Sequence, residues 1–255
     1  MAILQEYHRP RSAAEAIALL ARSEARLVFL AGGTLLVGEL ETRTAHGVTG
    51  VVDLRETGLD KINLREDVVS VGAMCTFSMV AAHPVLSKLA DGLLKRAAYG
   101  EGPLNLRNAA TVGGVVACAE YDSELYAALL ALDAAVTLYT LEGMKQTLPL
   151  RKSSIDGGLI AEVTLSMAKR HGGAARIART PSDRPIVAAY AAAPFDGDAN
   201  PEVAICGVGP RPLMAGAPLD PPDDFKGSAE YRLAMSEIVS QRALAQLEKA
   251  RSHVR

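Results

Sequence analysis

The hydrophobic pattern of this chain alternates between short apolar runs and short amphipathic segments. Apolar runs bounded by glycine or polar residues are typical of buried strands, and apolar residues at helical spacing are typical of helices. In the first half, the pattern predicts strands at 27–30, 51–54 and 68–72 and helices at 12–22, 77–99 (with a pause at His83-Pro84) and 124–132. This mixture indicates an αβ organisation and argues against one long-period repeat.

The second half predicts mainly strands until the C-terminus. The predicted strands lie at 135–139, 146–150, 155–165, 186–193 and 203–208, and one long helix lies at 228–251. In that helix, Ala234, Met235, Ile238 and Val239 have the spacing of core residues. A polar, glycine-bearing break at 169–173 is the best candidate for a domain boundary.

The stretch Leu27–Leu40 (LVFLAGGTLLVGEL) is the first candidate binding element. Its predicted strand ends in Ala31-Gly32-Gly33-Thr34, where hardly any side chain covers the backbone. Consecutive N–H groups exposed in such a turn can bind phosphate without a basic side chain. A tight turn between two core segments explains the same residues equally well, so the stretch alone leaves both interpretations open.

A second small-residue element, predicted as a turn, follows much later, at 110–117 (ATVGGVVA). Each element adjoins an apolar segment, so the two could approach one elongated ligand from two sides. Glu124 opens the next predicted helix, where the helix macrodipole favours a carboxylate. It could also accept hydrogen bonds from a ribose or ribityl chain, although the spacing alone favours the helix-terminus explanation.

Composition narrows the class of protein. Of the 255 residues, 49% are hydrophobic and 22% are charged, which is ordinary for a globular protein. The net charge of −2 provides no basic excess for binding nucleic acid. Cys75, Cys118 and Cys206 are widely spaced, which indicates reduced thiols in a cytoplasmic protein rather than disulfides or metal ligands. Neither a signal peptide nor a membrane span is expected.

Common catalytic and nucleotide-binding motifs are missing from the sequence. Gly33 and Gly38 have the spacing of a Walker A loop, but Glu39-Leu40 stands where Lys and Ser or Thr are required. There is no G-x-G-x-x-G after the first strands, no G-x-S-x-G elbow, and no metal-ligand spacing among the histidines. We therefore predict no catalytic residue and no metal site, and a cofactor that brings its own reactivity and is held largely by backbone groups.

Three segments, in order, resemble the FAD-binding medium subunit of molybdenum hydroxylases, the family of carbon monoxide dehydrogenase and xanthine dehydrogenase. They are LAGGTLLVGEL (30–40), NLRNAATVGGVVACAEYDSELYAALLALDA (105–134) and DDFKGSAEYRLAMSEIVSQRAL (223–244). The resemblance extends from about Tyr7 to the last helix. It implies an α+β fold of the PCMH type, with FAD-binding subdomains at 1–55 and 56–168 and a C-terminal domain of antiparallel sheet plus helices at 169–255.

The resemblance also implies the residues that bind FAD. The first glycine element would wrap the pyrophosphate, and the second would contribute from the other side. Glu124 occupies the place of an aspartate that meets the polyhydroxy chain of the flavin, and Leu159 or Ile160 would pack near the isoalloxazine ring. The implied residues are Ala31, Gly32, Gly33, Thr34, Leu35, Thr111, Gly113, Gly114, Glu124, Leu159 and Ile160.

In function, the resemblance implies an oxidoreductase subunit that carries FAD and transfers electrons. The expected partners are a large subunit with a molybdenum cofactor, where the substrate is oxidised, and a small subunit with [2Fe-2S] clusters, assembled as a dimer of heterotrimers. FAD on this chain would pass the electrons to an external acceptor. The alternatives are a stand-alone FAD oxidoreductase of the same fold and a scaffold subunit that has lost FAD.

Several positions depart from the pattern of that family. Val115 stands where Asn or Asp is frequent, and its side chain cannot form a hydrogen bond with a ligand. Ala174 stands where tyrosine is frequent, and Arg184 where phenylalanine is frequent. The departures at Val115 and Ala174 motivate the scaffold alternative.

Overall fold

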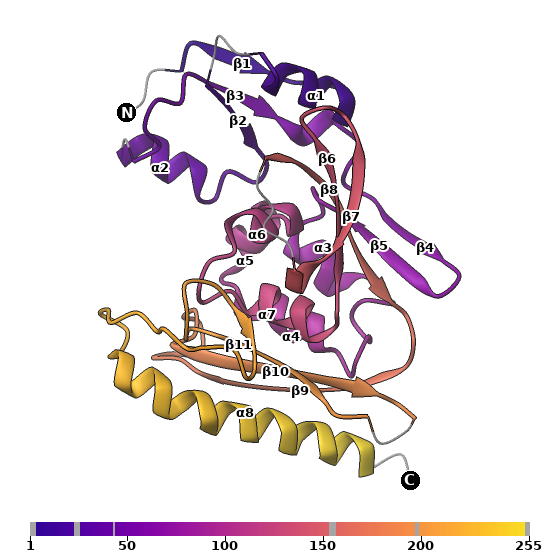
Figure 1. Ribbon diagram of the computed structural model, residues 1–255, viewed down its shortest axis with the longest axis vertical. Coiled ribbons are helices and arrows are strands. Elements are labelled where there is room, and N and C mark those ends of the chain that lie inside the picture. Colours follow the sequence, from indigo (N-terminus) through magenta and orange to yellow (C-terminus); the bar gives the residue numbers. More distant parts are fainter. Residues whose placement is uncertain (1–3, 23–25, 43, 153–156, 197–198, 253–255) are drawn as a thin grey trace.

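The computed structural model describes residues 4–22, 26–42, 44–152, 157–196 and 199–252. Its described strands form three sheets, of three, five and four strands. Figure 1 shows these sheets one below another, from the N-terminal part at the top to the long C-terminal helix at the bottom. The predicted boundaries after residues 55 and 168 fall between the sheets, while the division into three domains stays a prediction.

The first sheet is parallel and has the order β1-β3-β2. Its strands are β1 (Glu6–His8), β2 (Leu27–Leu30) and β3 (Gly50–Asp53), and the accompanying helices are α1 (Ala13–Leu20) and α2 (Leu36–Thr42). All four residues of β3 are buried, as expected for the central strand. In contrast, α2 has no buried residue, so the apolar residues after the first glycine turn do not form a core segment.

The second sheet is antiparallel and has the order β4-β5-β8-β6-β7. Its strands are β4 (Ile62–Arg65), β5 (Val68–Gly72), β6 (Ala135–Thr140), β7 (Lys145–Pro149) and β8 (Gly158–Ser166). The helices beside it are α3 (Phe77–Ala82), α4 (Leu93–Gly100), α5 (Leu104–Ala109), α6 (Val112–Cys118) and α7 (Glu124–Ala131), with 3₁₀ turns at Leu54–Glu56 and Leu150–Lys152. Every residue of α7 is buried, which makes this helix the centre of the largest hydrophobic cluster.

The third sheet is antiparallel and has the order β12-β11-β10-β9. Its elements are β9 (Arg170–Ile177), β10 (Val187–Pro194), β11 (Glu202–Cys206), β12 (Leu213–Met214) and the helix α8 (Ala229–Ser252). Along β10, Val187 and Ala189 join the cluster that includes α8, whereas Ala188 and Tyr190 join the cluster built around α7. The sheet is therefore buried on both faces, between α8 and the α4–α7 layer (Figure 1).

The prediction of a polar break at residues 169–173 is wrong, because strand β9 already begins at Arg170. Gly172 and Gly173 lie inside this strand because neighbouring backbone atoms approach them closely. A Cβ atom on Gly173 would lie well under 3.0 Å from the carbonyl oxygen of Ala243 in α8. The two backbones can approach this closely only without a side chain, which explains a glycine inside a strand.

Two helix predictions need correction. The predicted helix from residue 85 to Tyr99 begins only at Leu93, because Ala90, Asp91 and Gly92 all have positive φ and interrupt the helical path. In α8, Val239 is buried as predicted, but Ala234 is exposed. The buried positions of α8 instead follow Arg232, Ser236, Val239, Ala243 and Leu247.

The overall fold class predicted from the sequence, α+β with an antiparallel C-terminal sheet, is confirmed. Among the helices that the structure describes, we find none with the length and apolar character needed to cross a bilayer.

A network of polar contacts around Arg232 anchors α8 to the rest of the chain. The Arg232 side chain is fully buried and donates hydrogen bonds to the carbonyl oxygens of Ile186, Gly207 and Gly227. Its Nη2 lies 2.7 Å from Oδ1 of Asp224, whose Oδ2 accepts a hydrogen bond of 2.7 Å from the Tyr121 hydroxyl. This network connects α8 with the segment between α6 and α7.

The stability of the fold should fall in acid partly because of Asp224. Burial alone would raise the pKa of this carboxyl, but hydrogen bonds from Tyr121 and Arg232 outweigh burial and lower it from 3.8 to about 2. A lowered pKa in the folded state adds stability above the unfolded value, and that stability is lost as pH falls through the folded value. We expect the difference in unfolding free energy between wild type and Asp224→Asn to shrink between about pH 4 and pH 2 in urea titrations. A constant difference across this range would contradict the ion pair.

Candidate functional site: a cleft between two glycine elements

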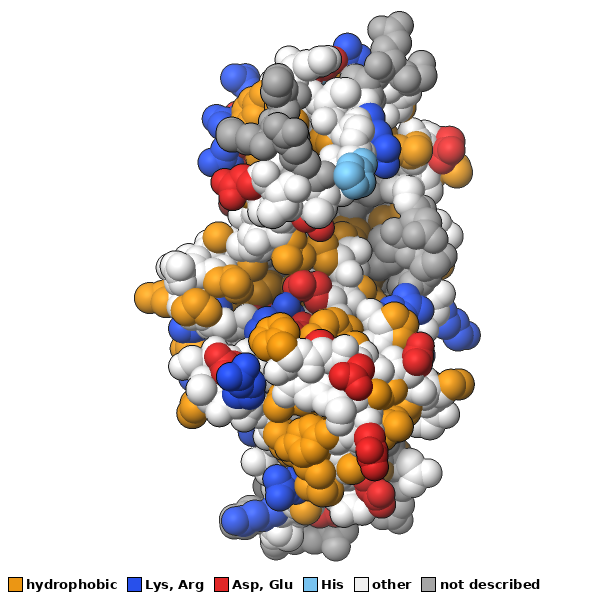
Figure 2. Space-filling view, turned by 90° about the vertical axis from the view of Figure 1, so that its left-hand side faces the viewer, with side chains coloured by type: hydrophobic (Ala, Val, Ile, Leu, Met, Phe, Trp, Pro, Cys, Tyr) orange, Lys and Arg blue, Asp and Glu red, His pale blue; other side chains and the backbone are white. Residues whose placement is uncertain are grey.

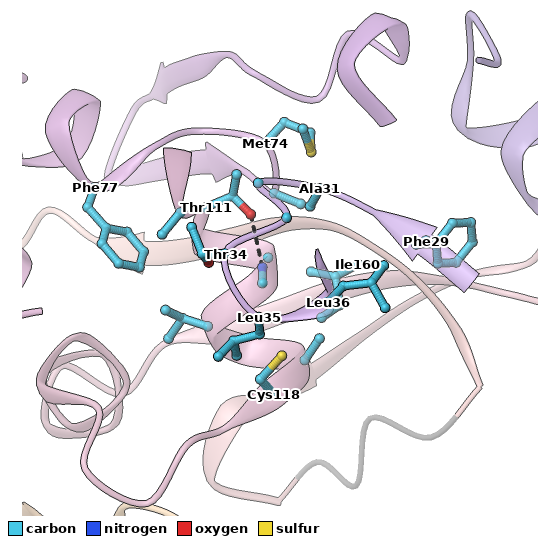
Figure 3. Close-up of a pocket in the computed structure, with 18 of the residues that line it drawn as sticks. Phe29, Ala31, Thr34, Leu35, Leu36, Met74, Phe77, Thr111, Cys118 and Ile160 are labelled. Carbon is cyan, nitrogen blue, oxygen red and sulfur yellow. Dashed lines mark hydrogen bonds between the residues drawn. The ribbon is translucent and has the colours of Figure 1, made fainter. Parts of the chain in front are cut away.

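The structure brings the two glycine elements together in one cleft of about 240 Å³. Ten of the eleven predicted binding residues line it, all except Glu124; they are Ala31, Gly32, Gly33, Thr34, Leu35, Thr111, Gly113, Gly114, Leu159 and Ile160. Figure 3 shows the turn after β2 passing beside Thr111 and the start of α6. On the outside of the molecule, hydrophobic and acidic side chains lie next to each other at mid-height (Figure 2). The predicted meeting of the two elements is thus found in the structure.

The first element offers backbone donors to a ligand. Among the described residues, the N–H groups of Gly32, Gly33, Thr34 and Leu35 have no hydrogen-bond partner. Gly33 adopts a positive φ of 71°, which turns the chain from β2 into α2. Consecutive unpaired N–H groups in a concave turn attract an anion, so this turn has the features of a phosphate cradle rather than of a core turn.

Gly32 is where the two elements touch. A Cβ atom on this residue would lie well under 3.0 Å from the carbonyl oxygen of Ala109, just before the second element. The neighbouring atoms belong to backbone, so they cannot rotate away as a flexible side chain would. Gly32 therefore allows the first turn to lie directly against the end of α5.

The second element is a helix start and not a free turn, which corrects the interpretation from sequence. Thr111 is the N-cap of α6 and its hydroxyl accepts a hydrogen bond of 3.1 Å from the N–H of Gly114, the dashed line in Figure 3. The N–H groups of Val112, Gly113 and Val115 are bound by carbonyl oxygens within the protein, those of Cys75, Ala73 and Thr111. This side of the cleft therefore offers a ligand a close-fitting wall and the Thr111 side chain, while its N–H groups at 112–115 are already bonded within the protein.

An apolar surface extends the cleft along β8. Leu159 and Ile160 line it, and both are buried. Phe29, Met74 and Phe77, which the sequence interpretation missed, also line the cleft, and Figure 3 shows Phe29 and Phe77 at its opposite ends. Their apolar character gave no signal in the sequence beyond that of ordinary core residues. Such a surface can cover flat aromatic rings.

Glu124 lies outside the lining of the cleft. Its side chain is 1% exposed, its Oε2 accepts a hydrogen bond of 2.5 Å from the Tyr190 hydroxyl, and its Oε1 forms an ion pair of 3.0 Å with Arg176. Burial raises the pKa of Glu124, and the positive charge of Arg176 counteracts this effect. The carboxylate is therefore engaged by the C-terminal sheet and is not presented to a ligand in this cleft.

Four ionisable side chains that were not predicted as binding residues line the cleft instead: Glu101, Cys118, Glu120 and Arg184. Glu101 and Glu120 face Arg184, with Nη2–Oε2 and Nη1–Oε2 distances of 2.9 and 2.7 Å. Arg184 had been noted from the sequence only as a departure from the family pattern. Cys118 also lines the cleft, and although it is exposed, its partial removal from water together with nearby Glu120 raises its thiol pKa, so the thiol is protonated near neutral pH.

The cleft has the features that an FAD molecule requires. FAD is elongated, carries a charged pyrophosphate between two polyhydroxy sugars, and ends in two flat ring systems. The unpaired N–H groups at Gly32–Leu35 suit the pyrophosphate, and the apolar surface at β8 suits a ring. The donor set therefore fits this cofactor, whereas the cleft lacks a lysine for nucleotide transfer among the residues that the structure describes.

Comparisons with known proteins agree with this fit. The family described as "FAD binding domain in molybdopterin dehydrogenase" matches residues 3–156, which is more than half of the chain. The 6-hydroxypseudooxynicotine dehydrogenase complex subunit alpha of Paenarthrobacter nicotinovorans is 31% identical over 172 residues, covering 64% of this chain and 57% of that relative. The nicotinate dehydrogenase FAD-subunit of Eubacterium barkeri is 29% identical over 143 residues, covering 55% of this chain and 48% of that relative.

The chain thus matches about half the length of these two curated relatives. A solved structure of carbon monoxide dehydrogenase from Hydrogenophaga pseudoflava shares the fold, with a TM-score of 0.90 and 22% identity over 98% of this chain and 99% of that chain. Taken with the family match, these findings show that the chain belongs to the family of FAD-binding domains of molybdopterin dehydrogenases.

Proposed function

We propose that this chain is the FAD-binding electron-transfer subunit of a cytoplasmic, molybdenum-containing hydroxylase or dehydrogenase complex. The observation that carries the proposal is the cleft in which unpaired N–H groups of the first glycine turn meet the second glycine element. The names of the two relatives, a dehydrogenase complex subunit and a dehydrogenase FAD-subunit, support the same role.

In this proposal the residues of the chain bind and orient the cofactor. The turn at 31–35 holds the pyrophosphate, and Thr111 with Gly113 and Gly114 forms the facing wall. Leu159 and Ile160 exclude water from one side of the flavin ring. When bound, FAD supplies the redox chemistry by accepting electrons and passing them on. No side chain of this chain needs to act as a general acid or base.

We propose that the partners are a large subunit with a molybdenum cofactor and a small subunit with [2Fe-2S] clusters, assembled as a dimer of heterotrimers. The clusters would deliver electrons to FAD, which would reduce an external acceptor. Substrate contacts would then lie on the large subunit.

Purification of the chain with the products of its neighbouring genes tests this proposal. We expect flavin absorption bands and two co-purifying subunits, with FAD released on denaturation. Flavin without partners would instead indicate a stand-alone oxidoreductase. Partners without flavin, and without FAD uptake by the purified complex, would indicate a scaffold subunit.

A further inference from the structure

Arg184 is the one Lys or Arg among the described residues that line the cleft, and it comes from the C-terminal part of the chain. It lies between β9 and β10, far in sequence from both glycine elements. Its guanidinium contacts Glu101, which follows α4, and Glu120 and Asp122, which lie between α6 and α7, at 2.9, 2.7 and 3.1 Å. One side chain from the connection between β9 and β10 therefore holds two separate loops of the cofactor cleft.

These carboxylates need Arg184 to remain close together. Glu101 is 3% exposed, and burial raises its pKa while Arg184 acts against that rise. Glu101 Oε1 also accepts hydrogen bonds from the Ser123 hydroxyl, at 2.6 Å, and from the N–H of Leu125, at 2.7 Å. The guanidinium therefore fixes Glu101, and Glu101 in turn fixes the start of α7. Without the positive charge of Arg184, the buried carboxylate of Glu101 would lose its cation and would be repelled by the nearby carboxylates of Asp122 and Glu120.

Glu120 is the member of this group that can meet a ligand. It lines the cleft, its side chain is 37% exposed, and its Oε2 is bound by Arg184. Among the described residues, its Oε1 has no hydrogen-bond partner. A carboxylate oxygen that is held in place and still free can accept a hydrogen bond from a hydroxyl group.

We propose that Arg184 is a positioning residue for the cofactor cleft. It holds Glu120 and the loop that contains Glu120 at the distance at which FAD binds, so that the C-terminal sheet determines the affinity for FAD. Lys226 offers a comparison within the same cluster. Its Nζ lies 2.6 Å from Asp122, but it does not line the cleft. This proposal rests on the proposed function, because it takes FAD as the ligand.

A double-mutant cycle tests whether Arg184 acts through Glu120. FAD is titrated against the full chain, freed of flavin, and binding is followed by quenching of flavin fluorescence. We expect Arg184→Gln to raise the Kd about tenfold, Glu120→Gln to raise it less, and the double variant to bind no more weakly than Arg184→Gln alone. Lys226→Met should leave the Kd within about twofold of wild type.

Three outcomes would overturn the inference or its basis. The positioning role would be overturned if Arg184→Gln bound FAD with the Kd of wild type. It would also be overturned if the fold-changes in Kd of the two single variants multiplied in the double variant. A wild-type chain that does not take up FAD would instead contradict the proposed function.

A second variant covers the case in which Arg184→Gln does not fold. Arg184→Lys keeps the positive charge but cannot span three carboxylates with one ammonium group. Without FAD, hydrogen exchange at the N–H of Leu125 should be faster in Arg184→Lys than in Lys226→Met. Equal exchange in these two variants would overturn the inference.

Discussion

Replacing Gly32 by alanine is expected to weaken FAD binding strongly. The added methyl group would lie well under 3.0 Å from the carbonyl oxygen of Ala109, so the first glycine turn would have to move away from the end of α5. A displacement of about 1 Å in a binding constellation can cost about 100-fold, and we expect the Kd for FAD to rise by at least that factor. Flavin fluorescence titration of the full chain measures this change.

Gly38→Ala is the matched control in the same stretch. Gly38 lies in the exposed helix α2, and a Cβ atom there would have no neighbour within 4 Å. Alanine favours a helix by about 1 kcal/mol over glycine, so this variant should fold at least as well and bind FAD normally. If Gly32→Ala retained the affinity of wild type, the close contact between the two elements would not be needed for the site.

Replacing Arg232 by methionine is expected to cause the largest loss of stability. The guanidinium is fully buried, it donates to three carbonyl oxygens, and it pairs with Asp224. Methionine would remove the hydrogen bonds to these three carbonyl oxygens and would leave the Asp224 carboxylate without the guanidinium that it pairs with. Breaking a buried pair by removing one partner costs about 3–5 kcal/mol, and the free energy of unfolding in urea should fall by that amount.

Arg242→Met provides the control for this substitution. Arg242 lies on the same helix, α8, and is exposed. Substitutions at such surface positions change stability by about 0.5 kcal/mol or less. Equal losses in the two variants would show that Arg232 stabilises the chain only as an ordinary helical residue.

The sequence predicted the elements well where periodicity was strong. The run at 27–30, the strands at 135–139 and 146–150 and the terminal helix all lie where expected, because their patterns match the strand and helix periods closely. The predicted helix at 85–99 was wrong at its start because three consecutive positive-φ residues depend on tertiary contacts. In the same way, the glycines at 172–173 signalled a break but serve close packing, Gly172 against Ala90 and Gly173 against Ala243 in α8.

The sequence predicted the part of the candidate site that is formed by backbone, which is the two glycine elements. Gly32, Gly113 and their neighbours lie in one cleft, as the paired glycine elements suggested. Glu124 and Arg184 show the limit of this reasoning. Whether a carboxylate faces a cleft or a neighbouring sheet is decided by long-range partners, here Tyr190 and Arg176, and no local spacing reveals them.

The most direct measurement is a crystal structure of the full chain with FAD bound. We expect the pyrophosphate to accept hydrogen bonds from the N–H groups of Gly32–Leu35, with Thr111 on the facing wall and a flavin ring near Leu159 or Ile160. FAD bound outside this cleft, or a pyrophosphate without contact to the first glycine turn, would contradict the proposed binding site.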